Sequence, residues 1–159
     1  MRLQTISKFA VAIAMLVGLG MIALGGLFMA LGFDAKSDIR AALAKERIVT
    51  SSDAPIPGVE VVDARTAKAQ QDAIEAHTFG RWGPYSELDR EDPRRETYIT
   101  GLTLRNSLNL AVVGFGMADM AVGIGGVTIV LGTIIAGLAL PVHLLVLRLG
   151  RLESRLGDM

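Results

Sequence analysis

The sequence contains no cysteine, and this absence excludes several kinds of site at once. Disulfides, thiolate nucleophiles and metal centres held by cysteine are all ruled out. The chain also has only two histidines, His77 and His143, so a histidine-based centre has few ligands to draw on. We therefore expect a protein that is not an enzyme and that holds no cofactor and no metal.

The chain also has no excess of positive or negative charge. Sixteen lysines and arginines balance sixteen aspartates and glutamates, and the formal net charge is zero. A nucleic-acid-binding protein needs a concentrated basic face to neutralise phosphates, and the basic residues here are scattered. We expect no nucleic-acid partner.

What the chain has instead is two long apolar runs, residues 9–33 and 110–147, in a sequence that is 51% hydrophobic. A helix of about 20 apolar residues is long enough to cross a hydrocarbon core of roughly 30 Å. We predict a mainly α-helical membrane protein. Its expected fold is a helical hairpin with two transmembrane helices that protrude into a small extracytoplasmic lobe.

The first run follows Arg2 and Lys8, as the core of a secretory signal would. Its apolar stretch is about 25 residues long, whereas the core of a cleaved signal peptide has about 7–15. We therefore predict an uncleaved signal-anchor, with residues 9–33 as the first transmembrane helix.

Basic residues flank the two runs at both ends of the chain. The positive-inside rule places such short basic flanks in the cytoplasm. Residues 34–108 carry eleven basic and thirteen acidic side chains, a net charge of −2, and are expected outside. We predict a multi-pass protein of the cell membrane, with residues 1–8 and 148–159 cytoplasmic. The basic flanks are Arg2, Lys8, Arg148, Arg151 and Arg155.

The second run is too long for one membrane crossing. As a single helix its 38 residues would extend about 57 Å. The helix must either protrude from the membrane or break near Gly123–Gly126. An unpaired carboxylate at mid-bilayer costs several kcal/mol, so Asp119 is best placed at the outer interface. We predict an apolar helix over residues 109–147, with the second transmembrane helix at about 121–147.

The intervening segment also has helix signals. Residues 35–47 are rich in helix formers, so the first helix should continue beyond the membrane. Asp63 is a typical N-cap for a helix over residues 64–77, and Gly80 is a typical stop. The Asp92–Pro93 pair predicts an N-cap and first helical position.

Small residues in the first run recur at helical spacing. Such faces let helices approach closely in lipid, although glycine and alanine are also common in membrane helices generally. We expect this face to pack against the second span. Its members are Ala10, Ala14, Gly18, Gly26 and Ala30.

The segment YSELDREDPRRETY, residues 85–98, alternates acids with arginines and lies close to a tryptophan. One interpretation is a solvated face with weak surface ion pairs. The other is a docking surface, because arginine beside aromatic residues is typical of interface anchors. The candidate docking residues are Trp82, Tyr85, Arg90, Arg94 and Arg95.

Two polar residues in the second run are candidate intramembrane groups, Asp119 and His143. The end of the chain adds an amphipathic tail, with Leu149, Leu152 and Leu156 on one face. Such a tail suits the inner leaflet, although simple extension of the preceding helix explains the pattern nearly as well.

Four segments together resemble a family of small actinobacterial two-span membrane proteins of unknown function: ERIVTSSDAP, IEAHT, YSELDREDPRR and RNSLNLAVVGFG. Members of that family often carry the label "aromatic ring-opening dioxygenase". An extradiol-type iron site needs two histidines and a carboxylate on one face. His77 and His143 are expected about a bilayer apart, so we reject this label here.

These observations favour a non-catalytic accessory subunit that docks on a larger membrane or cell-envelope complex. The expected partners are the lipid bilayer and either another protein or further copies of this chain. Two alternatives stay open. One is an envelope sensor or regulator, and the other is a small transport component that uses Asp119 and His143.

Overall fold

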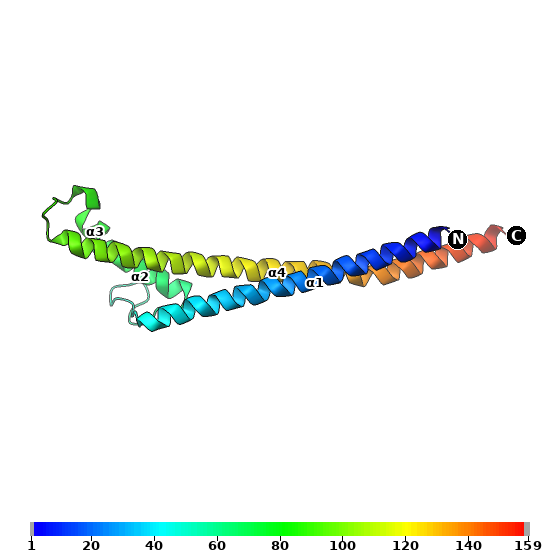
Figure 1. The fold of residues 1–159 in the computed structure, drawn as a ribbon, viewed down its shortest axis with the longest axis horizontal. Coiled ribbons are helices and arrows are strands. Elements are labelled where there is room, and N and C mark those ends of the chain that lie inside the picture. Colours follow the sequence, from blue (N-terminus) through cyan, green and yellow to red (C-terminus); the bar gives the residue numbers. More distant parts are fainter. Residues whose placement is uncertain (1, 158–159) are drawn as a thin grey trace. The chain divides into compact units, whose positions relative to one another are not determined.

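The computed structural model describes residues 2–157, with side chains for residues 6–151. The side chains of Arg2 and of the tail from residue 152 onward, including Leu152, Arg155 and Leu156, lie outside the described residues. The prediction of a mainly helical protein is confirmed (Figure 1). The elements are α1 (Arg2–Glu46), α2 (Ala64–His77), α3 (Phe79–Trp82), the short 3₁₀ helix η1 (Tyr85–Glu87) and α4 (Arg94–Gly157).

The chain divides into two compact units. The first, here called the apolar unit, combines Met1–Leu31 with Ala121–Met159. The second, here called the lobe unit, is Gly32–Met120. Helices α1 and α4 each contribute residues to both units, and α2, α3 and η1 belong to the lobe unit.

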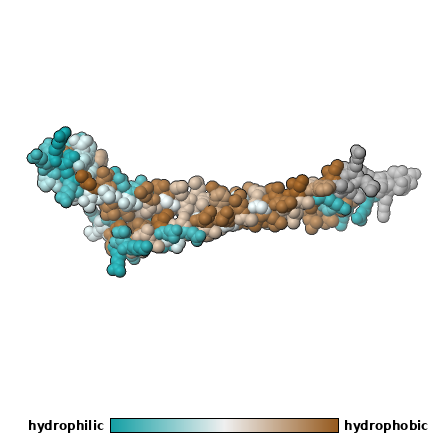
Figure 2. Space-filling view, viewed as in Figure 1, coloured by the Kyte–Doolittle hydropathy of each residue, from teal (hydrophilic) through white to brown (hydrophobic). Residues whose placement is uncertain are grey.

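Helices α1 and α4 are both long and apolar enough to cross a membrane. In the most apolar stretch of each, only 11% of the residues are buried inside the protein. The large aliphatic side chains along these stretches are therefore mostly exposed, and they form the brown surface in Figure 2. Exposed apolar side chains of this extent suit a lipid environment, because a soluble core helix would bury them.

Helix α4 is 64 residues long and continues without a break through Gly123–Gly126 and Pro141. Of the two ways to accommodate the long second run, the break is therefore wrong, and the helix is continuous. The predicted extension of the first helix is also confirmed, because α1 runs to Glu46.

In the apolar unit the two long helices run antiparallel and touch through glycines. A Cβ atom added to Gly18 would lie 2.6 Å from the carbonyl oxygen of Gly132, and one added to Gly25 would lie 2.5 Å from that of Gly125. The backbones are thus in direct contact at two levels, which only glycine permits. We call these four residues, Gly18, Gly25, Gly125 and Gly132, the glycine seam.

The seam corrects the small-residue face expected from the sequence. Gly18 is part of it, and Ala10 and Ala14 face α4 across a groove that they line together with it, but Gly26 and Ala30 are exposed. A Cβ at Gly26 would meet nothing within 4 Å. The interface position belongs to Gly25, because the contact repeats every seven residues and not every four.

The same repeat runs along α4. One series of its buried and half-buried positions recurs alternately three and four residues apart, the spacing that keeps one face of a helix against a partner helix. In the lobe unit these positions are Leu104, Leu108, Ala111, Phe115 and Ala118, and in the apolar unit they are Val122, Gly125, Ile129, Gly132, Ala136 and Ala139.

The lobe unit has a small core of its own, formed by Val61, Ala67, Ile74 and Leu108, with Leu43, Ile48, Leu104 and Val112 against it. It thus combines one turn of α1, the inner face of α2, and α4. Between α1 and α2 the backbones of Val49 and Glu60 form a short antiparallel bridge.

Helix α2 has the predicted bounds and the predicted cap. The backbone N–H of Thr66 donates to Asp63 Oδ1 at 2.8 Å, and the Thr66 hydroxyl receives the N–H of Asp63, which completes a capping box. Gly80 is not the stop residue. The helix ends at His77 as predicted, but it is closed by the Thr78 hydroxyl, which donates to the carbonyl of Ile74 at 2.7 Å, and Gly80 lies inside α3.

Candidate docking cleft

Three aromatic rings form a cluster where α3 and η1 meet the first turns of α4. Tyr98 is buried, and its ring centroid lies 6.2 Å from that of Trp82 and 5.5 Å from that of Tyr85. Its hydroxyl donates to the carbonyl of Gly83 at 3.1 Å. Gly83 has a φ of +74°, a conformation that glycine adopts readily and that directs the chain back toward α4.

Arg95 binds within this cluster. Its guanidinium carbon lies 4.1 Å from the ring centroid of Tyr85, in a cation–π contact, and its Nη1 donates to the carbonyl of Leu88 at 2.7 Å. Two of the candidate docking residues, Tyr85 and Arg95, thus hold the lobe unit together. Their availability to a partner is correspondingly reduced.

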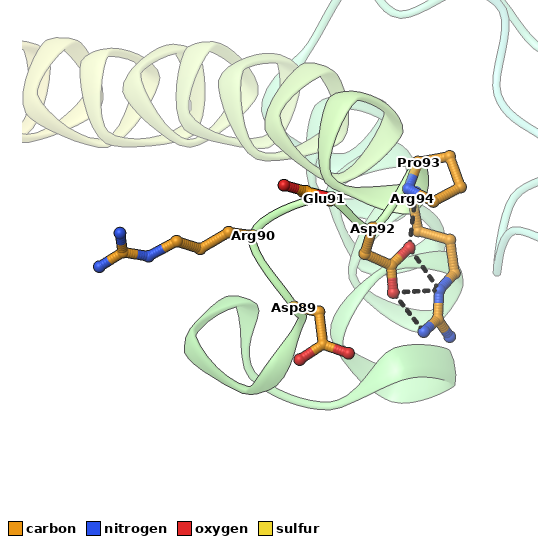
Figure 3. Close-up of a pocket in the computed structure, with 6 residues that line it drawn as sticks. All are labelled: Asp89, Arg90, Glu91, Asp92, Pro93 and Arg94. Atoms are coloured by element: carbon orange, nitrogen blue, oxygen red, sulfur yellow. Dashed lines mark hydrogen bonds and ion pairs between the residues drawn. The ribbon is translucent and has the colours of Figure 1, made fainter.

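Arg94 is also engaged internally, at the start of α4. Its backbone N–H donates to Asp92 Oδ1 at 2.8 Å, and its Nε lies 3.0 Å from the same carboxylate (Figure 3). The Asp92 carboxylate therefore accepts from the first turn of α4, as predicted, although the helix begins at Arg94 and not at Pro93. The hydrogen bonds from the Arg94 guanidinium, and next from its backbone N–H, hold the pKa of Asp92 below its usual value.

Arg90 behaves differently from its neighbours in the same loop. Figure 3 shows its side chain extended away from the carboxylate of Asp92 and from Arg94. With the residues that the structure describes, Arg90 forms no hydrogen bond or ion pair. Of Arg90, Arg94 and Arg95, it is the one that binds no other described side chain and is left available to a partner.

An open cleft of about 880 Å³ lies beside this loop, between the end of α2, α3 and the first turns of α4. Its wall includes His77, Arg81, Trp82, Arg94, Thr97 and Thr100. Arg81 is exposed, and neither its guanidinium nor the indole N–H of Trp82 has a hydrogen-bond partner among the described residues. A guanidinium and an indole without internal partners are the groups that most often anchor a protein interface.

His77 lies at the edge of the cleft and is fixed by a carboxylate from the loop before α2. Its Nε2 lies 2.5 Å from Asp53 Oδ2, and both side chains are about half exposed. The hydrogen bond to His77 is the main reason that the pKa of Asp53 lies below its usual value. Within the described part of the chain, no three potential metal ligands of the His, Cys, Asp or Glu type gather at one point.

The two polar residues of the second apolar run belong to different units. Asp119 lies in the lobe unit, where its Oδ1 is 2.5 Å from Lys36 Nζ on α1, so the carboxylate is paired. His143 lies in the apolar unit, and its Nδ1 is buried with no hydrogen-bond partner among the described residues.

Arg81 and Lys36 are the residues that the sequence interpretation missed. Arg81 precedes Trp82 directly, so the pairing of arginine with an aromatic residue was visible there as well. The partnership of Lys36 with Asp119 carries no such signal, because it joins positions 83 residues apart.

No known protein family, curated protein or solved structure matches this chain. The resemblance to the actinobacterial two-span family therefore stays a prediction. A function can therefore be inferred only from the contacts and the cleft of the lobe unit.

Proposed function

We propose that this chain is a non-catalytic integral membrane protein that docks on a larger membrane or cell-envelope assembly through the cleft of its lobe unit. The observation that carries the proposal is the pair Arg81 and Trp82 on the cleft wall. Both side chains have unused hydrogen-bonding groups, while the aromatic and arginine side chains around them bind one another. The guanidinium of Arg81 and the indole N–H of Trp82 thus keep unused hydrogen-bonding groups, although the Trp82 ring itself packs on Tyr98.

The chemistry of the cleft suggests which part of a partner it receives. The guanidinium of Arg81 matches the geometry of a carboxylate, and the indole of Trp82 offers an apolar surface with one donor. Thr97, near the start of α4, adds a hydroxyl to the lining of the cleft. A partner segment with an acidic residue beside an aliphatic or aromatic one would use all three groups.

The proposed location follows from the exposed apolar surface of α1 and α4. In this topology residues 9–33 and about 121–147 cross the cell membrane, both ends of the chain are cytoplasmic, and the lobe faces outward. The outward position of the lobe is supported by the net charge of −2 of residues 34–108, against the basic flanks at the chain ends.

The docking test is co-purification from native membranes in a mild detergent, with the tagged full chain as bait. The wild type should recover a larger complex in a fixed ratio. Arg81→Glu combined with Trp82→Ala should reduce that recovery at least about tenfold, as expected when two interface anchors are lost. Arg65→Glu, an exposed change of equal charge on α2 outside the cleft, should leave recovery unchanged. Equal recovery with all three proteins would contradict the proposal.

Orientation is tested separately by cysteine accessibility, which a chain without native cysteine makes simple. Ser52→Cys lies in an exposed loop of the lobe unit and should react with a membrane-impermeant maleimide on intact cells. Ser154→Cys should react only after the cells are opened. The reverse pattern would overturn the orientation while leaving the docking proposal to its own test.

A transport function receives less support from the same observations. Asp119 and His143 are 24 residues apart on α4, which is nearly seven helical turns. Asp119 is also neutralised by Lys36. A continuous polar path would need further polar side chains between these two levels, and the stretch between them is almost wholly apolar.

A further inference from the structure

In the lobe unit, the exposed side of α4 carries a second regular series of mostly large apolar side chains. Its positions are alternately four and three residues apart, the spacing of a helix face that pairs with another helix. All of them are exposed, Leu110 by 71% and Met117 by 63%. At about 100° per residue they lie on the side of α4 away from the buried Leu108 and Phe115. We call these residues the outer stripe: Ile99, Thr103, Asn106, Leu110, Val113, Met117 and Met120.

The charges of α1 beside this part of α4 make acyl chains a poor cover for the outer stripe. Lys36 pairs with Asp119, and the Ile39 side chain lies against Gly114, so a charged part of α1 runs beside residues 114–119. Two exposed carboxylates of the same part of α1 form no hydrogen bond or ion pair with the described residues: Asp34 and Asp38. Unpaired carboxylates are expensive in hydrocarbon, and water solvates large aliphatic side chains unfavourably. A protein surface is therefore the favoured cover for the outer stripe.

The outer stripe is suited to pairing with an identical surface. Among residues 99–120 only Arg105 and Asp119 are charged, and each pairs with a residue of another helix. The stripe itself therefore carries no charge that would repel a second copy. Gly116 lies at its edge, and a Cβ atom there would meet nothing within 4 Å, which leaves room for a close approach of two backbones.

Asn106 is the amide within the stripe, and it favours one arrangement of two copies. It is exposed, and its side chain forms no hydrogen bond with the described residues. A single asparagine in an apolar helix face can pair with the same asparagine of a parallel helix, because one amide donates and the other accepts. Two copies inserted into one membrane in the same orientation are parallel, so their asparagines can meet in register.

We propose that two copies of this chain associate in parallel through the outer stripe, as a two-stranded coiled coil of their α4 helices. Each aliphatic side chain packs against its counterpart around a two-fold axis, which removes it from water. The inference rests on the membrane location in the proposed function, because the membrane holds the two copies parallel. No residue of the outer stripe lines the docking cleft, so the cleft stays open to another protein.

The test is disulfide cross-linking of single-cysteine variants of the full chain in native membranes, since the chain has no cysteine of its own. Counterpart residues of a paired stripe lie within reach of a disulfide, which spans a Cα separation of roughly 4–7 Å. Leu110→Cys and Val113→Cys should each yield a covalent dimer under mild oxidation. The matched control is Ser37→Cys, an exposed position next to Lys36 on α1, and it should yield at least about tenfold less dimer.

A second variant tests the contact itself. Leu110→Glu places two like charges opposite each other in the dimer and should reduce cross-linking through Val113→Cys at least about tenfold. Position 110 is exposed, so the change leaves the core of the lobe unit intact.

Three results would each overturn the proposal. They are equal cross-linking of all three cysteine variants, no dimer from either stripe position, and an adduct with a protein of another mass. Undiminished cross-linking in the presence of Leu110→Glu would overturn it as well. Cross-linking is measured on this chain alone, whereas docking is measured by recovery of a larger complex, so the two failures are distinguishable.

Discussion

At the scale of single residues, the end of α1 contains a local conflict between residue type and backbone conformation. Arg47 follows the last residue of the helix and has a φ of +49°, in the left-handed region. Glycine is the residue usually found at this position after a helix, because a Cβ atom is disfavoured there by roughly 1–2 kcal/mol.

We therefore expect Arg47→Gly to stabilise the protein by about 1 kcal/mol, which would raise the thermal midpoint by a few degrees. Circular dichroism at 222 nm in detergent would measure it. Lys45→Gly, two residues earlier and inside the helix, should instead destabilise the protein by about 1 kcal/mol. A decrease in stability for both substitutions would show that the conformation of residue 47 imposes no strain.

Asp63 gives a second residue-scale prediction, on the pH dependence of stability. The backbone N–H of Thr66 is the main reason that the pKa of Asp63 lies below its ordinary value of 3.8. A carboxyl whose pKa is lowered on folding stabilises the protein above the unfolded pKa, and this contribution is lost as the pH falls through the folded pKa. The lobe unit should therefore lose stability below about pH 4.

The Asp63→Asn substitution removes the charge of this side chain but keeps its capping hydrogen bond. The amide oxygen still accepts the Thr66 N–H, so the helix stays capped at neutral pH, but the group no longer titrates. We expect this variant to lose less stability between pH 5 and pH 3 than the wild type, by equilibrium unfolding in detergent. Asp63→Ala should cost about 1 kcal/mol at neutral pH. An identical pH profile for the wild type and the Asp63→Asn variant would contradict the assignment.

At the scale of elements, the pairing of α1 with α4 depends on the glycine seam. A Cβ at Gly25 would lie 2.5 Å from the Gly125 carbonyl oxygen and 2.8 Å from Cγ1 of Ile129, and backbone atoms cannot move away without separating the helices. Gly26, the next residue, faces open space. The two positions differ in their environment alone, which makes them a matched pair.

We expect Gly25→Ala to destabilise the apolar unit by about 1–3 kcal/mol, the usual range for overpacking. Gly26→Ala should be neutral or slightly stabilising, because alanine is the better helix former. Thermal unfolding in detergent, followed by circular dichroism, distinguishes the two. Equal effects of the two substitutions would show that the backbones are farther apart than described.

At this scale some features are set by local sequence and others are not. The bounds and N-cap of α2 followed from Asp63 and the alanine-rich stripe, since both signals are local. The register of the seam did not. Small residues are so frequent in α1 that a four-residue and a seven-residue repeat both fit, and only the position of α4 decides between Gly25 and Gly26.

At the scale of the whole molecule, the exposed apolar surface of α1 and α4 leads to a prediction about solubility. Covering so many large aliphatic side chains requires lipid or detergent, because water solvates them unfavourably. In membranes washed with alkaline carbonate the chain should stay in the pellet, and mild detergent should release it. Release by carbonate alone would contradict the membrane location.

The helical class, the two long apolar segments, the charge of the segment between those two, and the capped helix α2 all follow from the amino-acid sequence alone. Each of these depends on neighbours along the chain, where spacing and residue type are directly readable. Only the tertiary structure decided that Gly25 and Gly125 touch, that Lys36 neutralises Asp119, and that Arg81 stays free while Arg95 binds Tyr85. Those outcomes depend on which residues meet across separate helices, and such meetings are set by packing and not by local sequence.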